Sequence, residues 1–144
     1  VDDMCRTMKG GVGGHAGLFG TAFDVAVVLQ MYIQGGYYGG KKLLSKSVIN
    51  QFNTCYYCDK DNRRGVGFDK PELNDGSSDC KGQPSPTSFG HYGFTGTYAW
   101  ADPENEMVIV FLSNRTYPTM DNKLLGKHNI RTRVREVVYK ALVD

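Results

Sequence analysis

Residues 89–97, which read FGHYGFTGT, form the segment with the strongest indication of a functional site. Their aromatic content predicts a β-strand, but three glycines interrupt it. Glycine weakens a strand unless another group must approach the backbone closely. The segment therefore predicts a strand edge whose backbone another group approaches closely. His91 brings a titratable imidazole to this edge; the alternative is an exposed strand histidine without a function.

A serine followed three positions later by a lysine occurs in the string SDCK at residues 78–81. A serine hydroxyl becomes a nucleophile when a neighbouring base takes its proton, and a Ser-x-x-Lys pair does this when a helix aligns the two side chains. Gly76, Gly82 and Pro84 surround the string, so no helix can form there. We therefore do not expect Ser78 to be the nucleophile.

Cys55 and Cys58 have the spacing of half a metal knuckle or of a redox motif. A zinc site needs two further ligands at similar spacing, and the sequence offers none. The pair could also form a disulfide, from Cys55 to Cys58 or Cys80, or stay as inert free thiols, which we favour. No metal and no cofactor is expected.

The first half of the chain is predicted to hold two helices. Thr21 followed by Asp24 supplies a capping-box-like start for a helix over about residues 22–34, and two glycines end it. Apolar residues lie nearly all round this helix, which predicts that it is buried rather than amphipathic. Ser45 or Ser47 caps a second, shorter helix.

The second half is predicted to form an antiparallel sheet and a last helix. Strand-like segments cover residues 88–94, 97–101 and 107–112, and the last two flank the turn DPENE, so they form a hairpin. The continuously apolar residues 107–112 predict a strand covered on both faces. Apolar residues recur with helical spacing over about residues 130–142, which places the arginines, Arg135 among them, on the exposed side.

Residues 59–88 are predicted to connect the two halves as a polar segment. Within it residues 65–68 look like a strand, and residues 74–88 look like a long surface loop. Together the elements favour an α+β fold, an antiparallel sheet flanked by helices, in a single domain over residues 1–144.

Composition and charge exclude some classes of protein. The 144 residues are 40% hydrophobic, and the net charge of +2 comes from 17 basic and 15 acidic residues. They form no basic stripe, so nucleic acid is not an expected partner. No run approaches the roughly 20 apolar residues of a membrane-spanning helix. The first residue is Val1, without a signal-peptide pattern, so we expect the chain to begin at a cut.

The ordered series of segments resembles the C-terminal third of the class C-like branch of the β-lactamase and penicillin-binding-protein superfamily. His91-Tyr92-Gly93 fits that superfamily's third motif, in which Lys or His is followed two positions later by Gly on a strand at the active site. Residues 10–29, residues 63–71, the hairpin and residues 112–118 also match. The resemblance covers nearly the whole chain and implies a partial β-lactamase/transpeptidase-like fold.

The resemblance also implies roles for particular residues. The backbone N–H of Phe94 would donate to the oxyanion of a tetrahedral intermediate, and Gly93 would let the substrate lie along the strand edge. His91 would bind a substrate carboxylate or support the hydroxyl network. The expected substrate-binding set is completed by Tyr92, Thr95 and Asn114.

Several other candidates are interpreted as structural. Asn114 and Arg115 are expected to anchor the last helix, with contact to substrate as the alternative. His15 is expected to cap backbone in a glycine-rich loop, and His128 to be solvated. The core is expected to include two aromatic side chains of one strand face, Tyr98 and Trp100.

The resemblance implies an enzyme that acylates a serine with a β-lactam, an ester or a D-amino-acid peptide and then hydrolyses the adduct. The superfamily's Ser-x-x-Lys lies far upstream of the third motif, and no Tyr-x-Asn occurs in this chain. We therefore expect the nucleophile to lie in an upstream part of the same domain and the isolated chain to be inactive.

A narrower resemblance links residues 91–97 and 112–115 to exported bacterial proteins that join a family-three glycoside hydrolase module to a β-lactamase-like module. This implies a periplasmic or secreted protein with a small-molecule or peptide substrate. The rival hypothesis is a catalytically degenerate binding or scaffolding module attached to that glycoside hydrolase. Without the upstream part, residues 107–112 should expose an apolar sheet face, which predicts self-association.

Overall fold

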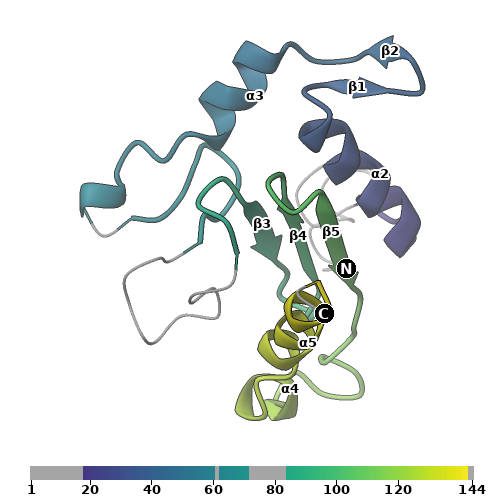
Figure 1. Ribbon diagram of the computed structural model, residues 1–144. Coiled ribbons are helices and arrows are strands. Elements are labelled where there is room, and N and C mark those ends of the chain that lie inside the picture. Colours follow the sequence, from purple (N-terminus) through teal and green to yellow (C-terminus); the bar gives the residue numbers. More distant parts are fainter. Residues whose placement is uncertain (1–17, 61, 72–83, 143–144) are drawn as a thin grey trace, which may run out of the picture.

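The computed structural model describes residues 18–60, 62–71 and 84–142 (Figure 1). Its centre is an antiparallel sheet in the order β3-β4-β5, formed by β3 (Phe89–Tyr92), β4 (Tyr98–Asp102) and β5 (Met107–Phe111). Trp100 of the central strand lies opposite Gly90 on one side and Ile109 on the other. The predicted hairpin, formed by β4 and β5, is confirmed.

Helices cover both faces of this sheet. On one face Leu29 of α2 (Ala22–Ile33) packs with Ala101, and Val108 and Val110 of β5 are packed against them. On the other face Tyr139 of α5 (Ile130–Lys140) packs with three side chains from β4 and β5, namely Tyr98, Trp100 and Ile109. The fold class and the expectation that β5 is covered on both faces are therefore confirmed, and so is the core position of the two aromatic residues. The expectation that residues 107–112 expose an apolar sheet face is wrong, because α2 and α5 pack on the two faces of β5.

Glycine at position 90 allows the sheet to close over the tryptophan. A Cβ atom at Gly90 would collide with the ring of Trp100 and with the carbonyl oxygen of Ala99. The glycine that sequence analysis ascribed to close approach is thus needed for packing against the neighbouring strand, because only hydrogen fits there.

The helices of the first half begin where their caps predict. Thr21 and Asp24 form a capping box, with Thr21 N donating to Asp24 Oδ2 at 2.7 Å and Asp24 N donating to Thr21 Oγ1 at 3.2 Å. Of the two candidate serines, Ser45 is the N-cap of α3 (Lys46–Asn53). The sequence analysis missed the short hairpin between them, β1 (Tyr37–Tyr38) and β2 (Lys41–Lys42). Its signal was the pair Gly39-Gly40, since both residues have positive φ and such pairs favour tight hairpin turns.

The expectation that α2 is buried all round is wrong. Phe23 is 72% exposed and Val28 is 50% exposed, because only one side of the helix meets the sheet. Among the α2 residues only Leu29 is fully buried. The helix therefore leaves apolar side chains uncovered on its outer side, Phe23 and Val28 among them.

The predicted orientation of the last helix is also wrong. Arg135 and Tyr139 are buried, whereas Val137 is 66% exposed. The hydroxyl of Tyr139 donates to Asp102 Oδ2 at 2.6 Å, and this hydrogen bond turns the Tyr139 side of α5 toward the sheet. Before α5 lies a short helix that the sequence analysis did not predict, α4 (Leu124–Lys127).

No strand forms at residues 65–68, which is a further correction. Gly65 N donates to Phe68 O at 2.9 Å and closes a turn instead, because the Phe68 ring packs against Tyr32 and Phe89 at centroid distances of 5.2 and 5.0 Å. The next residue, Asp69, pairs with Gly90 of β3 through two backbone hydrogen bonds of 2.8 and 3.0 Å.

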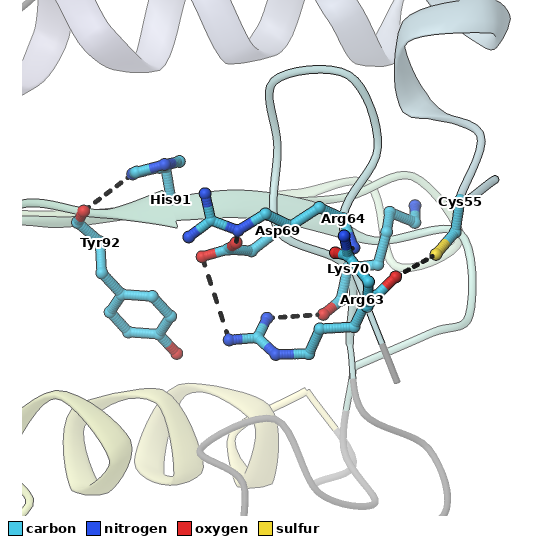
Figure 2. A network of polar contacts seen from close by, with 8 residues as sticks. Cys55, Arg63, Arg64, Asp69, Lys70, His91 and Tyr92 are labelled. Atoms are coloured by element: carbon cyan, nitrogen blue, oxygen red, sulfur yellow. Dashed lines mark hydrogen bonds and ion pairs between the residues drawn. The ribbon is translucent and has the colours of Figure 1, made fainter. Parts of the chain in front are cut away.

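The carboxylate of Asp69 contacts two arginines of the same loop (Figure 2). Arg64 Nε lies 2.9 Å from Asp69 Oδ1, and Arg63 Nη2 lies 4.0 Å from Asp69 Oδ2. Arg63 also donates from Nη1 to the carbonyl oxygen of Lys70 at 2.9 Å. These contacts hold residues 63–70 together as a loop, and the backbone pairing of Asp69 with Gly90 attaches the loop to β3.

Cys55 and Cys58 form a disulfide, so the favoured interpretation as free thiols is wrong and the first of the two disulfide pairings holds. Cys55 Sγ also lies 3.3 Å from the carbonyl oxygen of Asn62; an oxidised sulfur has no proton to donate, so this is a packing contact. Cys58 begins a single turn of 3₁₀-helix, η1 (Cys58–Lys60).

The predicted surface loop over residues 74–88 falls largely outside the described residues, but its end does not. Ser85 and Ser88 are buried, because Ser85 donates from both N and Oγ to the carboxylate of Asp102, at 2.9 and 2.5 Å. The end of this segment is therefore part of the core. None of the described helices is long and apolar enough to span a membrane.

Candidate active site

A cavity of about 650 Å³ lies between the start of α2, the β3–β4 turn and the end of β5. Its polar wall comes from β3 and the strand ends, and includes His91, Thr95 and Asn114. Its apolar wall is formed in part by Val25 and Val28 of α2. The two walls lie more than 60 residues apart in the sequence, and the packing of the helix on the sheet brings them together.

The structure brings five of the six predicted site residues into the lining of this cavity, namely His91, Tyr92, Gly93, Thr95 and Asn114. The sixth, Phe94, has a side chain that is 66% exposed and is not part of the lining. Its predicted role concerns the backbone N–H, so the position of the ring does not decide it.

The β3–β4 turn is tightly hydrogen-bonded and needs both of its glycines. Gly93 N donates to Thr97 O at 2.9 Å, and Gly96 N donates to Gly93 O at 3.0 Å. Gly96 has φ +95°, a conformation that residues with a side chain rarely adopt. A Cβ atom at Gly93 would collide with the hydroxyl of Thr97. The turn therefore fixes the direction in which the Phe94 peptide points.

The backbone N–H of Phe94 donates to no acceptor in the part of the chain that the structure describes. Its carbonyl, by contrast, accepts a hydrogen bond of 2.8 Å from Arg115 Nε. The peptide unit that contains this N–H is held at its other end, because the Gly93 carbonyl accepts from Gly96 N at 3.0 Å, so the N–H can meet a developing oxyanion without reorganising.

Arg115 holds this turn through several contacts. Its backbone N donates to Thr95 O at 2.8 Å, and its guanidinium carbon lies 4.7 Å from the centre of the Phe94 ring. Nη1 also lies 3.4 Å from the carbonyl oxygens of Met120 and Asn122. Arg115 was expected to anchor the last helix; its contacts instead hold the β3–β4 turn and residues 120–122.

His91 and Tyr92 point to opposite faces of β3 (Figure 2). The exposed His91 ring places Nδ1 2.8 Å from the carbonyl oxygen of Tyr92. A carbonyl oxygen only accepts, so Nδ1 carries the proton and Nε2 of the neutral ring is an acceptor. Protonation would convert Nε2 into a donor. The same side chain can thus accept from a hydroxyl or donate to a carboxylate.

The Tyr92 ring belongs to the core rather than to the polar wall. It lies 5.1 Å from the ring of Tyr98, centre to centre, and the Arg131 guanidinium of α5 lies 4.8 Å from its centre. At the far end of the cavity, Asn114 Oδ1 accepts from Thr116 Oγ1 at 2.7 Å, which leaves its amide nitrogen for other partners.

Other candidates lie elsewhere. His15 and the Ser78–Lys81 string are outside the described residues, and His128 is exposed at the end of α4. No group of three or more His, Cys, Asp or Glu side chains in residues 18–60, 62–71 and 84–142 is placed to hold a metal ion.

A strand-edge histidine and an open backbone N–H beyond it are features that the superfamily resemblance implied, and the structure adds a cavity beside them. The family model described as Beta-lactamase matches residues 2–131. The chain therefore belongs to the β-lactamase family.

Its relatives carry a more specific name. It is 39% identical over 122 residues to proteins named "Putative D-alanyl-D-alanine carboxypeptidase" from Salmonella enteritidis PT4 (strain P125109), Salmonella agona (strain SL483) and Salmonella typhi. The match covers 84% of this chain and 28% of each relative. The chain thus spans little more than a quarter of the length of these relatives.

Proposed function

We propose that this chain forms one wall of the active site of a serine hydrolase that cleaves D-amino-acid peptides through an acyl-enzyme. β-Lactams and esters are the other acyl donors that the same site would accept. The observation that carries the proposal is the open Phe94 N–H beside a cavity lined by His91, Gly93 and Thr95. Family membership and the carboxypeptidase names of the relatives support the choice of reaction.

In the proposed reaction a serine from the upstream part of the domain attacks the carbonyl carbon of the substrate, and a neighbouring base takes its proton. The Phe94 N–H donates to the oxyanion that forms. Collapse of the intermediate breaks the bond to the leaving amine, which takes the proton. Water then attacks the ester and releases the second product. His91, with Nε2 facing outward from its hydrogen bond to Tyr92, binds the substrate carboxylate when protonated.

The test needs a longer protein that contains the upstream Ser-x-x-Lys. We expect it to give a burst with a chromogenic cephalosporin or a p-nitrophenyl ester and to be labelled by a fluorophosphonate, whereas the 144-residue chain alone should show neither signal. Turnover by the chain alone would contradict the proposal.

Gly93→Val in the longer protein tests the oxyanion donor. A Cβ atom at Gly93 would collide with Thr97, so the turn must shift and tilt the Phe94 N–H. Loss of one such donor typically lowers turnover by about 100- to 1000-fold. His91→Ala is the matched control: it should weaken substrates that carry a carboxylate and leave uncharged esters nearly unaffected. Unchanged turnover in Gly93→Val would refute the assignment of Phe94.

The glycoside hydrolase fusion and the degenerate binding module stay hypotheses, since the names of the relatives above mention neither. The upstream sequence separates them from the enzyme: an intact Ser-x-x-Lys supports the enzyme, and its loss supports the module. We also propose a location outside the cytoplasm, in the periplasm or secreted, on the basis of the bacterial carboxypeptidase relatives.

A further inference from the structure

A second cavity, of about 630 Å³, lies between the end of α2, helix α3 and residues 86–89. It shares no lining residue with the candidate active site. Its charged lining residues are two lysines, Lys46 at the start of α3 and Lys70, and no acidic side chain is among those that line it. The cavity is thus a separate and cationic feature of the molecule.

Lys70 is an unusual residue in this wall because it is only 7% exposed. Its Nζ donates to Asn53 Oδ1 at 3.1 Å and to the carbonyl oxygen of Thr87 at 3.0 Å, and it lies 5.8 Å from the centre of the Phe89 ring. All three partners are neutral, and an ammonium group has three donors. Within the described residues Lys70 has no ion pair, so one donor and most of the charge are left without a direct partner.

Among the residues that the structure describes, the carboxylates near Lys70 have other partners. Asp69 pairs with the two arginines beside it, and in Figure 2 its side chain extends in a different direction from that of Lys70. Glu104 accepts from Thr87 Oγ1 at 2.9 Å. Asp102 attracts the Lys70 charge from a distance, but it already accepts hydrogen bonds from Ser85, Tyr139 and Asn105.

The balance of these effects leaves the Lys70 cation poorly compensated. Burial lowers the pKa of its ammonium from 10.5 to about 8, although the attraction of Asp102 opposes the shift. Burying a charge costs free energy unless a counter-charge or full hydrogen bonding accompanies it. An anion in contact with Nζ would supply both.

The rest of the cavity suits a ligand with an apolar part. Ile33, Ile49 and Phe89 form apolar walls, and amide or hydroxyl groups of Asn50 and Thr54 lie among them. A small inorganic anion would leave the apolar walls without contacts, whereas an organic acid fills both kinds of surface.

We propose that this cavity binds a small organic monocarboxylate, with its carboxylate against Lys70 Nζ and its apolar body against Ile33, Ile49 and Phe89. The site is independent of the proposed hydrolase activity, so it can be tested on the chain as it stands.

The experiment compares benzoate with benzamide, which has nearly the same shape and no charge, by NMR of the lysine side chains and the Ile methyl groups. Benzoate should shift the signals of Lys70 and Ile49 and raise the pKa of Lys70. Its dissociation constant should be low millimolar at pH 7 and about 100-fold higher at pH 10, because a lysine with a pKa of about 8 is almost entirely neutral there. Benzamide should produce neither effect.

Lys70→Met should abolish benzoate binding, and Lys41→Met, in the exposed strand β2, is the matched control that should retain it. Three results would overturn the proposal: equal binding of benzamide and benzoate, no shift in the native chain at roughly 50 mM benzoate, tenfold above the expected dissociation constant, or an identical response in Lys70→Met. The comparison of benzoate with benzamide uses the native chain, so it still decides the question if Lys70→Met does not fold.

Discussion

Arg115 alone makes several contacts that hold the turn around Phe94. It bonds to the Phe94 carbonyl, packs on the Phe94 ring and bonds through its own backbone to Thr95. The Phe94 carbonyl belongs to the peptide unit after the one that carries the Phe94 N–H, so Arg115 positions this donor only through the backbone of the turn and does not touch the substrate.

We therefore predict that Arg115→Met in the longer protein lowers kcat for an ester substrate by about 10- to 100-fold, less than full loss of an oxyanion donor, with little change in KM. Arg115→Lys keeps the charge but loses the planar group that bonds and stacks at once, so it should recover only part of the rate. Steady-state kinetics check this. A variant that unfolds would be recognised by its circular dichroism, and a folded Arg115→Met with normal kcat would contradict the positioning role.

Lys70 gives the fold a pH dependence with a defined sign. Its folded pKa of about 8 lies below the ordinary value of 10.5, so between these values the unfolded chain binds more protons, and stability rises with pH. Below pH 8 both states are protonated and the cost of burying the charge is complete.

We predict that the free energy of unfolding of the native chain, measured relative to that of Lys70→Met, increases by roughly 2 kcal/mol between pH 7 and pH 10. Urea denaturation at the two pH values measures this difference. Lys41→Met, whose lysine is exposed, should show no such change relative to the native chain, and a flat profile for Lys70 would show that its ammonium is not desolvated.

At the scale of elements, Asp102 joins three parts of the chain at the end of β4. It is fully buried and accepts hydrogen bonds from Ser85, Asn105 and Tyr139. Burial alone would raise the pKa of this carboxyl group, but the hydrogen bonds outweigh burial and hold it below 3.8. Its contribution to stability is therefore complete above the ordinary pKa and is lost as the pH falls through the lowered one.

We predict that Asp102→Asn lowers the free energy of unfolding by about 2 to 4 kcal/mol, since the amide nitrogen cannot accept from these donors. Tyr139→Phe should cost about 1 to 2 kcal/mol. The double variant should cost less than the sum, because both changes remove the same hydrogen bond. Urea denaturation of the native chain, the two single variants and the double variant measures the coupling free energy between Asp102 and Tyr139. Strictly additive losses would mean that their hydrogen bond contributes nothing to stability.

The sequence could predict elements that depend on local signals but not those that depend on contacts between distant residues, such as Tyr139 with Asp102. Local signals sufficed for the capping box of α2 and for the β4–β5 hairpin, because Thr21, Asp24 and the DPENE turn act within a few residues. The face of α5 could not be read from its valines, since Tyr139 bonds to Asp102, which lies 37 residues away. The turn at residues 65–68 was mistaken for a strand because the packing of Phe68 on Tyr32 and Phe89 is equally non-local.

In the candidate site, too, the part that depends on local sequence was predicted and the part that depends on long-range packing was not. The glycine pattern of residues 89–97 located the strand edge, and the structure places five of the six predicted residues around one cavity. The apolar wall was not predicted as part of the site, because Val25 and Val28 reach it only through the packing of α2 on β4 and β5.

At the scale of the whole molecule, the outer edge of β5 and the apolar side of α2 both lack cover among the described residues. An unpaired strand edge is a template for pairing with another chain, and Leu112 at its end is 45% exposed.

We predict that the isolated chain self-associates with increasing concentration, and that a longer protein with the upstream part of the domain is monomeric under the same conditions. Light scattering over a range of concentrations measures both. A monodisperse monomer of the isolated chain at high concentration would contradict this prediction.

The two walls of the candidate active site lie far apart in the sequence, with Val25 in α2 and Asn114 beyond β5. Contacts between distant residues form late in folding, whereas a hairpin such as β4–β5 can form within microseconds. On a ribosome, α2 leaves the exit tunnel some 80 residues before its partner strand, which at about 5 to 20 residues per second is a wait of several seconds. Throughout that interval the apolar side of α2 has no sheet to cover it, and a chaperone that binds exposed apolar helices would find its target there.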